Sequence, residues 1–304
     1  MVADPCWRIM ATHGLFVPDP ACKLMRAQIV AGGGPGYSTS NFHEPDYSKY
    51  GPRGEDSYFH LRPSMPAMFA LAPDGLVAYC FGPHNLVHDQ AIFFTEVPSG
   101  VGLELNKPYF PINLTATTFK LSLIPYQPPL DLQSPIIVEP IGQNPIIMFR
   151  PVWYGVQGGG CGGIIGDQGT PMGYWGLDGT GPEGVVQSFG LQGGAGHAGF
   201  KLGGSGGVNA WGGQAGSQYQ NDGIDGVNGT GAGGGGAAPC VDPALDWGGT
   251  GGAAGAFGEI WLIPQPGESY FCWAGRGGEP KPAGPGGFRG GKGGHGQVLI
   301  TQFF

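Results

Sequence analysis

The chain has 304 residues, of which 63 are glycine and 29 are proline, and only 12 % are charged. Its formal net charge is −8 and its Lys and Arg residues form no cluster, so we expect no nucleic-acid partner, because phosphate-backbone binding needs a basic surface. No apolar run reaches the roughly 18 residues that span a bilayer, and the start MVADPCWRIM lacks a basic signal-peptide region, so we expect a cytosolic product without membrane insertion.

Glycine content divides the chain into two parts. Residues 1–150 contain only 12 glycines, and the other 51 lie in residues 151–304. In the first part, apolar runs of four to eight residues are bounded by Pro, Gly, Asp and Asn, and no helical periodicity lasts for three turns. We therefore predict an all-β protein, with a β-rich sandwich or barrel-like region at 1–150 and a glycine-rich domain at 151–304.

Two stretches of the first part predict β-hairpins. Residues 67–81, AMFALAPDGLVAYCF, contain two apolar runs joined by Pro-Asp-Gly at 73–75, where proline presets φ and glycine accepts a positive φ. Residues 136–149, IIVEPIGQNPIIMF, repeat this pattern with Gly-Gln-Asn at 142–144. We expect each stretch to fold back on itself.

Residues 89–132 have an alternating pattern that predicts strands with one buried face. A turn is expected at Thr115–Thr118, and Pro111 favours an edge position for its strand, since proline cannot donate a ladder hydrogen bond. The alternating residues are Val101, Leu103 and Leu105, then Phe110, Ile112 and Leu114, then Phe119, Leu121 and Leu123.

The same stretch has a characteristic order of residues, formed by Asp89, Phe93, Phe94, Thr95, Pro98, Gly100, Val101, Tyr109, Phe110, Ile112, Asn113, Thr115, Thr118, Phe119, Lys120, Leu121 and Ser122. This order resembles a small β module of bacteriophage virion proteins, found in tail components and in head-associated proteins. The sequence departs from the module at Val97–Val101 and at Ile124–Gln127. The resemblance covers about 45 residues and implies a structural role in the virion, without a particular chemistry.

In residues 151–304, glycine recurs at every third position in short runs, of which the last is GPGGFRGGKGGHG at 284–296. Three residues per turn is the period of a polyproline-II helix, which rises about 3.1 Å per residue and has no internal hydrogen bonds. A glycine in each turn leaves one side bare, so that neighbouring backbones can approach and bond to one another. The runs are too short and too poor in proline for collagen.

These runs predict a bundle of parallel and antiparallel polyglycine-II helices with a few strands. The chain would fold back at Asp178–Pro182, Ala237–Pro243 and Pro264–Gly267. Ordering a glycine costs about 1–2 kcal/mol, so the helices need a cooperative bundle or an oligomer. The alternative is a flexible linker, which the interleaved Trp and Phe residues disfavour.

The C-terminal stretch combines the glycine runs with predicted strands at 259–263, 269–273 and 297–303 and a turn at Pro266-Gly267. This pattern is similar to the glycine-rich C-terminal domain of phage tail fibres and tip adhesins, over roughly 150 residues. In the tip adhesins of T-even-like phages, the family fold is a polyglycine-II sandwich whose distal loops contact the host receptor. The resemblance implies a virion protein made in the host cytoplasm.

We expect a non-enzymatic tail fibre or tail-tip attachment protein. The alternative is a capsid head fibre, a decoration protein or a tail adaptor. Expected partners are other virion proteins, a host outer-membrane protein or glycan, and further copies of the chain, with a trimer as one option. Exposed aromatic rings beside glycine-rich bends are the receptor-binding candidates, and their alternative role is to cap the bundle. These residues are Tyr174, Trp175, Trp211, Tyr219 and Trp247.

The sequence offers only weak signals for other chemistry. Asp222, Asp225 and Asn228 are three residues apart and could bind calcium, but such residues are more often solvated turn residues. Carboxylate pairs for glycoside hydrolysis exist at Glu44 with Asp46 and at Glu55 with Asp56, without evidence of a cleft. The six cysteines form no CxxC, so we expect free thiols rather than a zinc site or a redox pair. We also expect no bound metal, no cofactor and no catalytic residue.

Overall fold

The computed structural model describes residues 6–10, 14–39, 51–61, 67–71, 78–80, 86, 91–97, 99–105, 107–124, 134–138, 146–151, 154–156, 158–162, 174–175, 185–195, 203–211, 222–238, 248–267 and 269–304. The described residues form strands and no helix, in three antiparallel sheets, which confirms the predicted all-β class. None of them belongs to a helix that could cross a membrane.

The chain divides into two compact units. Unit 1 comprises Met1–Leu61 and Trp153–Phe304, and unit 2 comprises Arg62–Val152. Glycine content separates residues 1–150 from the rest, whereas strand pairing joins residues 1–61 to the glycine-rich part.

Unit 2 is a closed barrel in the order β10-β5-β6-β9-β8-β7. Its apolar core contains Phe94, Tyr109 and Phe119, and the rings of Phe94 and Tyr109 meet edge to face at 5.0 Å. The strands are β5 (Ala67–Leu71), β6 (Ala78–Cys80), β7 (Ile92–Glu96), β8 (Pro108–Ile112), β9 (Thr118–Ser122) and β10 (Ile146–Pro151).

The structure confirms one predicted hairpin and contradicts the other. β5 pairs with β6, with Phe69 opposite Cys80, while the predicted bend at 73–75 lies outside the described residues. The hairpin at 136–149 is wrong, because β10 pairs with β5 on one side and β7 on the other. Barrel closure uses both edges of β10, and the Ile136 amide instead donates to the Leu121 carbonyl.

The predicted turn at Thr115–Thr118 is confirmed, because the Thr115 amide donates to the Thr118 carbonyl at 2.9 Å. The edge position expected from Pro111 is wrong, because β8 lies between β7 and β9. The described pairs of β8 with β7 involve Pro108 and Tyr109, so Pro111 lies beyond them and its missing N–H interrupts no described pair with β7.

Unit 1 contains two five-stranded sheets. The predicted C-terminal strands and the turn at 266–267 are confirmed, and Gly267 in that turn has φ +81°. The first sheet has the order β1 (Cys6–Met10), β16 (Gln297–Phe303), β3 (Leu24–Val30), β14 (Phe257–Leu262) and β13 (Val185–Leu191). The second has the order β12 (Tyr174–Trp175), β11 (Tyr154–Val156), β4 (Ser57–Leu61), β15 (Tyr270–Trp273) and β2 (Gly14–Phe16).

A single apolar core joins the two sheets. Met25, Ala27 and Ile29 alternate along β3 and are fully buried, as expected for a strand with one core face. From the second sheet, Phe59 stacks on Tyr270 at 5.2 Å between ring centroids. Unit 1 is therefore built as a β-sandwich.

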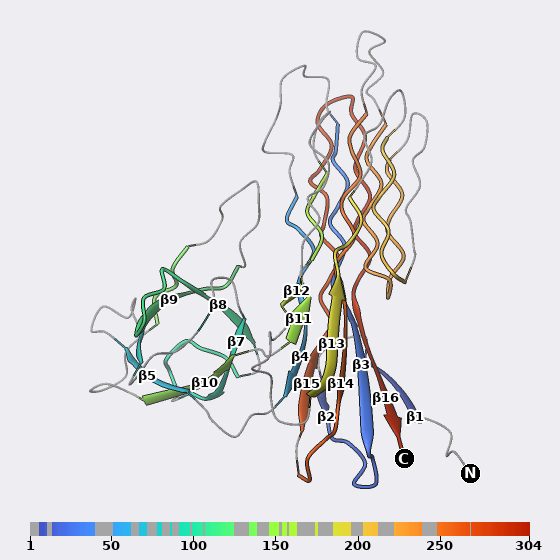
Figure 1. Ribbon diagram of the computed structural model, residues 1–304. Helices are drawn as coiled ribbons and strands as arrows, with labels where there is room; N and C mark the ends of the chain where they lie inside the picture. Colours follow the sequence, from blue (N-terminus) through green and yellow to red (C-terminus); the bar gives the residue numbers. More distant parts are fainter. Residues whose placement is uncertain are drawn as a thin grey trace. The chain divides into compact units, whose positions relative to one another are not determined.

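Extended glycine-rich segments continue from one end of these strands (Figure 1). We call them rods. The rod 31–39 follows β3, for example, and the rod 288–296 leads into β16. The described rods are 31–39, 51–56, 158–162, 192–195, 203–208, 222–229, 231–238, 248–256, 274–284 and 288–296.

Rod 31–39 lies at the centre of these segments. Its amides donate to rod 248–256 from Ala31, Gly34 and Tyr37, and to rod 288–296 from Gly33, Gly36 and Thr39, at 2.8–3.0 Å. Its carbonyls accept from rods 158–162, 231–238 and 274–284, and Gly32 donates to Glu55 in rod 51–56. Six neighbouring rods thus bond to one rod, and the bonds to four of these neighbours recur at intervals of three residues.

Consecutive glycines in rod 31–39 face different neighbours. A Cβ atom on Gly32 would overlap the Arg276 carbonyl, one on Gly33 the Ala232 carbonyl, and one on Gly34 the Gly160 carbonyl. The sequence AGGGPG at 31–36 therefore has glycine at three successive positions because all three sides of the rod are covered by backbone.

Candidate functional site

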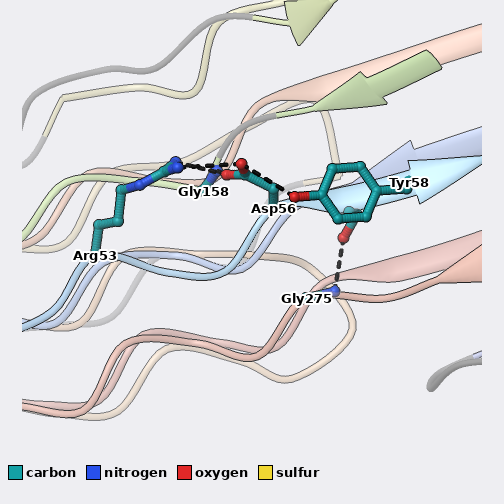
Figure 2. Close-up of polar contacts among 6 residues, drawn as sticks. Arg53, Asp56, Tyr58, Gly158 and Gly275 are labelled. Atoms are coloured by element: carbon teal, nitrogen blue, oxygen red, sulfur yellow. Dashed lines mark hydrogen bonds and ion pairs between the residues drawn. The ribbon is translucent and has the colours of Figure 1, made fainter. Parts of the chain in front are cut away.

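A buried polar network lies where the rods meet the strands of the second sheet. Arg53 forms a bidentate ion pair with Asp56, with Nη1 to Oδ1 at 2.5 Å and Nη2 to Oδ2 at 3.1 Å. The Gly158 amide donates to Asp56 Oδ1 at 2.8 Å, and the Tyr58 hydroxyl donates to Oδ2 at 3.4 Å (Figure 2). Arg53 and Asp56 are 4 % and 2 % exposed, so the carboxylate is fully enclosed by its donors.

Buried hydroxyl groups connect the rods in the same way. The Ser57 hydroxyl donates to the Val30 carbonyl at 2.7 Å. It accepts from the Gly275 amide at 2.8 Å, the bond drawn at Gly275 in Figure 2. In the central rod, the Ser38 hydroxyl donates to the Lys281 carbonyl and accepts from the Gly290 amide. Each hydroxyl is small enough to fit between backbones and satisfies one donor and one acceptor.

These contacts give the carboxylates of this region a structural role. A glycoside hydrolase needs two carboxylates that face a substrate. Asp56 is occupied by four hydrogen bonds from the fold, and Glu55 Oε2 accepts from the Arg276 amide at 3.1 Å. The other predicted pair, Glu44 with Asp46, lies outside the described residues.

The side chains considered for calcium form a ladder between two rods. Asp222 Oδ1 accepts from the Arg289 amide and Asp225 Oδ1 from the Lys292 amide, both at 2.7 Å. Asn228 Oδ1 accepts from the His295 amide at 3.2 Å. These oxygens bind backbone, and the described residues contain no group of three or more His, Cys, Asp or Glu side chains that could hold a metal ion.

Charged side chains line the same surface. Lys292 Nζ lies 2.8 Å from Glu279 Oε1, and Arg289 Nη2 lies 3.5 Å from Glu279 Oε2. His295 Nδ1 accepts from the Gly277 amide at 3.0 Å. The two cations, Arg289 and Lys292, therefore lie close to three carboxylates, those of Glu279, Asp222 and Asp225, which leaves no net positive charge for an anionic ligand.

The predicted aromatic residues lie in different parts of unit 1. Tyr174 and Trp175 form β12 of the second sheet, whereas the Trp211 ring packs beside the Phe257 ring of the first sheet at 6.1 Å. Trp211 is partly buried, and its amide donates to Asn209 Oδ1 at 2.9 Å. Tyr219 and Trp247 lie outside the described residues.

Among the cysteines whose side chains the structure describes, Cys22, Cys161 and Cys272 are buried thiols that form no disulfide. Burial raises the pKa of the Cys272 thiol to about 12 and also raises the pKa of Cys22, because desolvation disfavours the thiolate. A thiol that stays protonated is a poor nucleophile. These residues therefore pack as small apolar side chains.

Sequence reasoning missed the Arg53–Asp56 pair and the row formed by Arg289, Lys292 and His295. Arg53 and Asp56 are three residues apart, and so are the successive members of the row, so both groups follow the three-residue period of the glycines. This spacing is the sequence signal that could identify them. Comparison of the chain with family models, with curated proteins and with solved structures found no match.

Proposed function

We propose that the rods are polyglycine-II helices packed as a bundle. The observation that carries this proposal is the central rod 31–39, to which six rods hydrogen-bond, four of them at three-residue intervals. Three residues per turn and the absence of internal bonds are the properties of this helix. The overlap that any Cβ atom at Gly32, Gly33 or Gly34 would cause supports the same packing.

We further propose that the protein is a non-enzymatic bacteriophage virion protein, most simply a tail fibre or tail-tip attachment protein. The support is the similarity of the C-terminal stretch to tail fibres and tip adhesins, together with a sandwich whose strands continue into rods. The carboxylates Glu55 and Asp56 bond to the fold itself, which favours binding over hydrolysis. On this proposal the rods form a stiff support, and the receptor is a host outer-membrane protein or glycan.

The test uses phage particles that carry this protein. Gold-labelled antibodies against the purified protein are imaged on the particles, and the purified protein is added to host cells before the phage. The proposal predicts label at the tail tip and a reduced rate of adsorption. Label on the head, with adsorption unchanged, would instead support the alternative of a head fibre or decoration protein.

Heat-denatured protein is the matched control for the adsorption assay, because it keeps the composition and loses the fold. Native protein that blocks adsorption no better than the denatured sample would contradict an attachment role. Loss of polysaccharide from the cell surface during incubation would contradict the non-enzymatic part of the proposal.

A further inference from the structure

Rod 222–229 lies at the surface and is not held by burial of apolar side chains. Ile224 and Val227 are 39 % and 53 % exposed. The rod contacts rod 231–238, where the Gly235 amide donates to the Ile224 carbonyl at 2.9 Å, and it contacts rod 288–296. Its place in the bundle must come from polar contacts.

Three Asx-Gly steps supply these contacts, and each step binds both backbone groups of one residue in rod 288–296. The Asx side-chain oxygen accepts from that residue's amide, and the glycine amide donates to the same residue's carbonyl. We call this arrangement the Asx clamp. Its steps are Asp222-Gly223 on Arg289, Asp225-Gly226 on Lys292 and Asn228-Gly229 on His295, with amide-to-carbonyl distances of 2.7, 2.8 and 2.9 Å.

The residue types of the clamp follow from its geometry. A Cβ atom on Gly223 would overlap the Gly235 carbonyl, and one on Gly226 would crowd the Gly294 amide. The third step uses the neutral amide oxygen of Asn228, so the clamp needs an acceptor rather than a charge. The side chains of Arg289 and Lys292 are not part of it, because they pair with Glu279.

We propose that the Asx-Gly-Xaa repeat at 222–230 is a recognition element that binds the backbone of a glycine rod at every third residue. It fixes the position of rod 222–229 in the bundle and its register along rod 288–296. Glycine rods present identical backbone groups, so contacts between bare backbones alone specify register weakly. The clamp ends at a turn in which the Gly229 and Gly231 amides both donate to the His295 carbonyl. This turn fixes the register of the two rods at His295.

Amide hydrogen exchange of the full chain, measured by NMR, tests the proposal. The variant Asp222→Ala/Asp225→Ala/Asn228→Ala removes all three side-chain acceptors. We expect the amides of Arg289, Lys292 and His295 to exchange roughly tenfold faster or more, the effect of losing one hydrogen bond of ordinary strength. Unchanged protection of these three amides would overturn the proposal.

Two matched variants separate backbone recognition from charge pairing. Asp222→Asn/Asp225→Asn keeps the acceptors, and Arg289→Ala/Lys292→Ala removes the cations while leaving their amides in place. We expect near-wild-type protection in both. If either variant loses protection as the triple alanine variant does, charge pairing holds the rod and the clamp does not.

The central amides of Gly33 and Gly36 report whether the bundle itself survives. If they also lose protection in the triple variant, the single variant Asp225→Ala decides the question. We expect its effect to centre on the Lys292 amide, with Gly33 unchanged. A Lys292 amide as protected as in the wild type would overturn the proposal.

Discussion

At the scale of single residues, glycine in the central rod acts by leaving space for another backbone. We predict that Gly34→Ala destabilises the protein by about 3 kcal/mol or more, because its Cβ atom would overlap the Gly160 carbonyl and neither backbone can move without breaking other bonds. Urea denaturation measures the change in the free energy of unfolding.

The matched control is Val227→Ala, on a side of a rod that faces solvent. Val227 is 53 % exposed, so we expect a change within about 0.5 kcal/mol. Equal effects of the two substitutions would mean that rod 31–39 is not enclosed by other backbones.

The Cys272 thiol gives a second prediction at this scale. Burial raises its pKa from 9.0 to about 12, so at pH 9 the folded protein holds almost no Cys272 thiolate. We expect iodoacetamide to leave the Cys272 peptide unlabelled in the folded protein and to label it in urea, as measured by mass spectrometry. Stability should also fall as the pH rises above about 9, because the unfolded thiol ionises there and the folded one does not. Rapid labelling of the folded protein would contradict burial.

At the scale of elements, the Arg53–Asp56 pair joins rods 51–56 and 158–162 to β4. Asp56→Ala leaves Arg53 buried without its carboxylate and removes the acceptor of the Gly158 amide. Removing one partner of a buried pair typically costs about 3–5 kcal/mol, and we predict a loss of this size in thermal or urea unfolding of unit 1.

The pair of Lys107 with Glu104 in unit 2 is the matched control, since its side chains are 38 % and 68 % exposed. We expect Lys107→Ala to change stability by less than about 1 kcal/mol, because solvent screens such a pair. A comparable loss in both variants would show that the enclosure of Asp56 has no special effect.

Local patterns predicted elements well when the signal lay in one stretch of chain. The C-terminal strands on either side of Pro266-Gly267 were predicted, and the hairpin of β5 and β6 was predicted from two apolar runs joined by Pro-Asp-Gly at 73–75. The hairpin at 136–149 failed because β10 has two partners distant in sequence, β5 and β7, and a local turn signal does not report such competition.

The site was less predictable because it depends on contacts between distant segments. The three-residue glycine period indicated close backbones, but it did not tell which rod lies at the centre. Rod 31–39 lies in the glycine-poor part of the sequence, whereas most of the rods that bond to it lie in residues 151–304. The spacing of Asp222 and Asp225 suggests a cation site, whereas their role as acceptors depends on rod 288–296, whose amides they bind.

At the scale of the whole molecule, unit 2 is an insertion in unit 1. β4 and β11 are antiparallel neighbours, with Phe59 opposite Tyr154, and Arg62–Val152 forms the connection between them. Replacing residues 62–152 by a short Gly-Ser linker should therefore leave unit 1 folded, as judged by a cooperative unfolding transition.

Residues 151–304 alone are the informative comparison. This fragment lacks β3, β4 and the central rod, so we expect no cooperative transition until a peptide of residues 1–61 is added. A fragment that folds by itself would contradict the shared core described for unit 1.

Amide exchange at Gly33, Gly34 and Gly36 of the intact protein tests the central claim most directly. Their amides donate to Gly294, Ala253 and Gly291 in two neighbouring rods, so the account predicts exchange as slow as that of the β3 amides. Exchange at the rate of an unstructured glycine chain would contradict an ordered bundle of backbone-bonded rods.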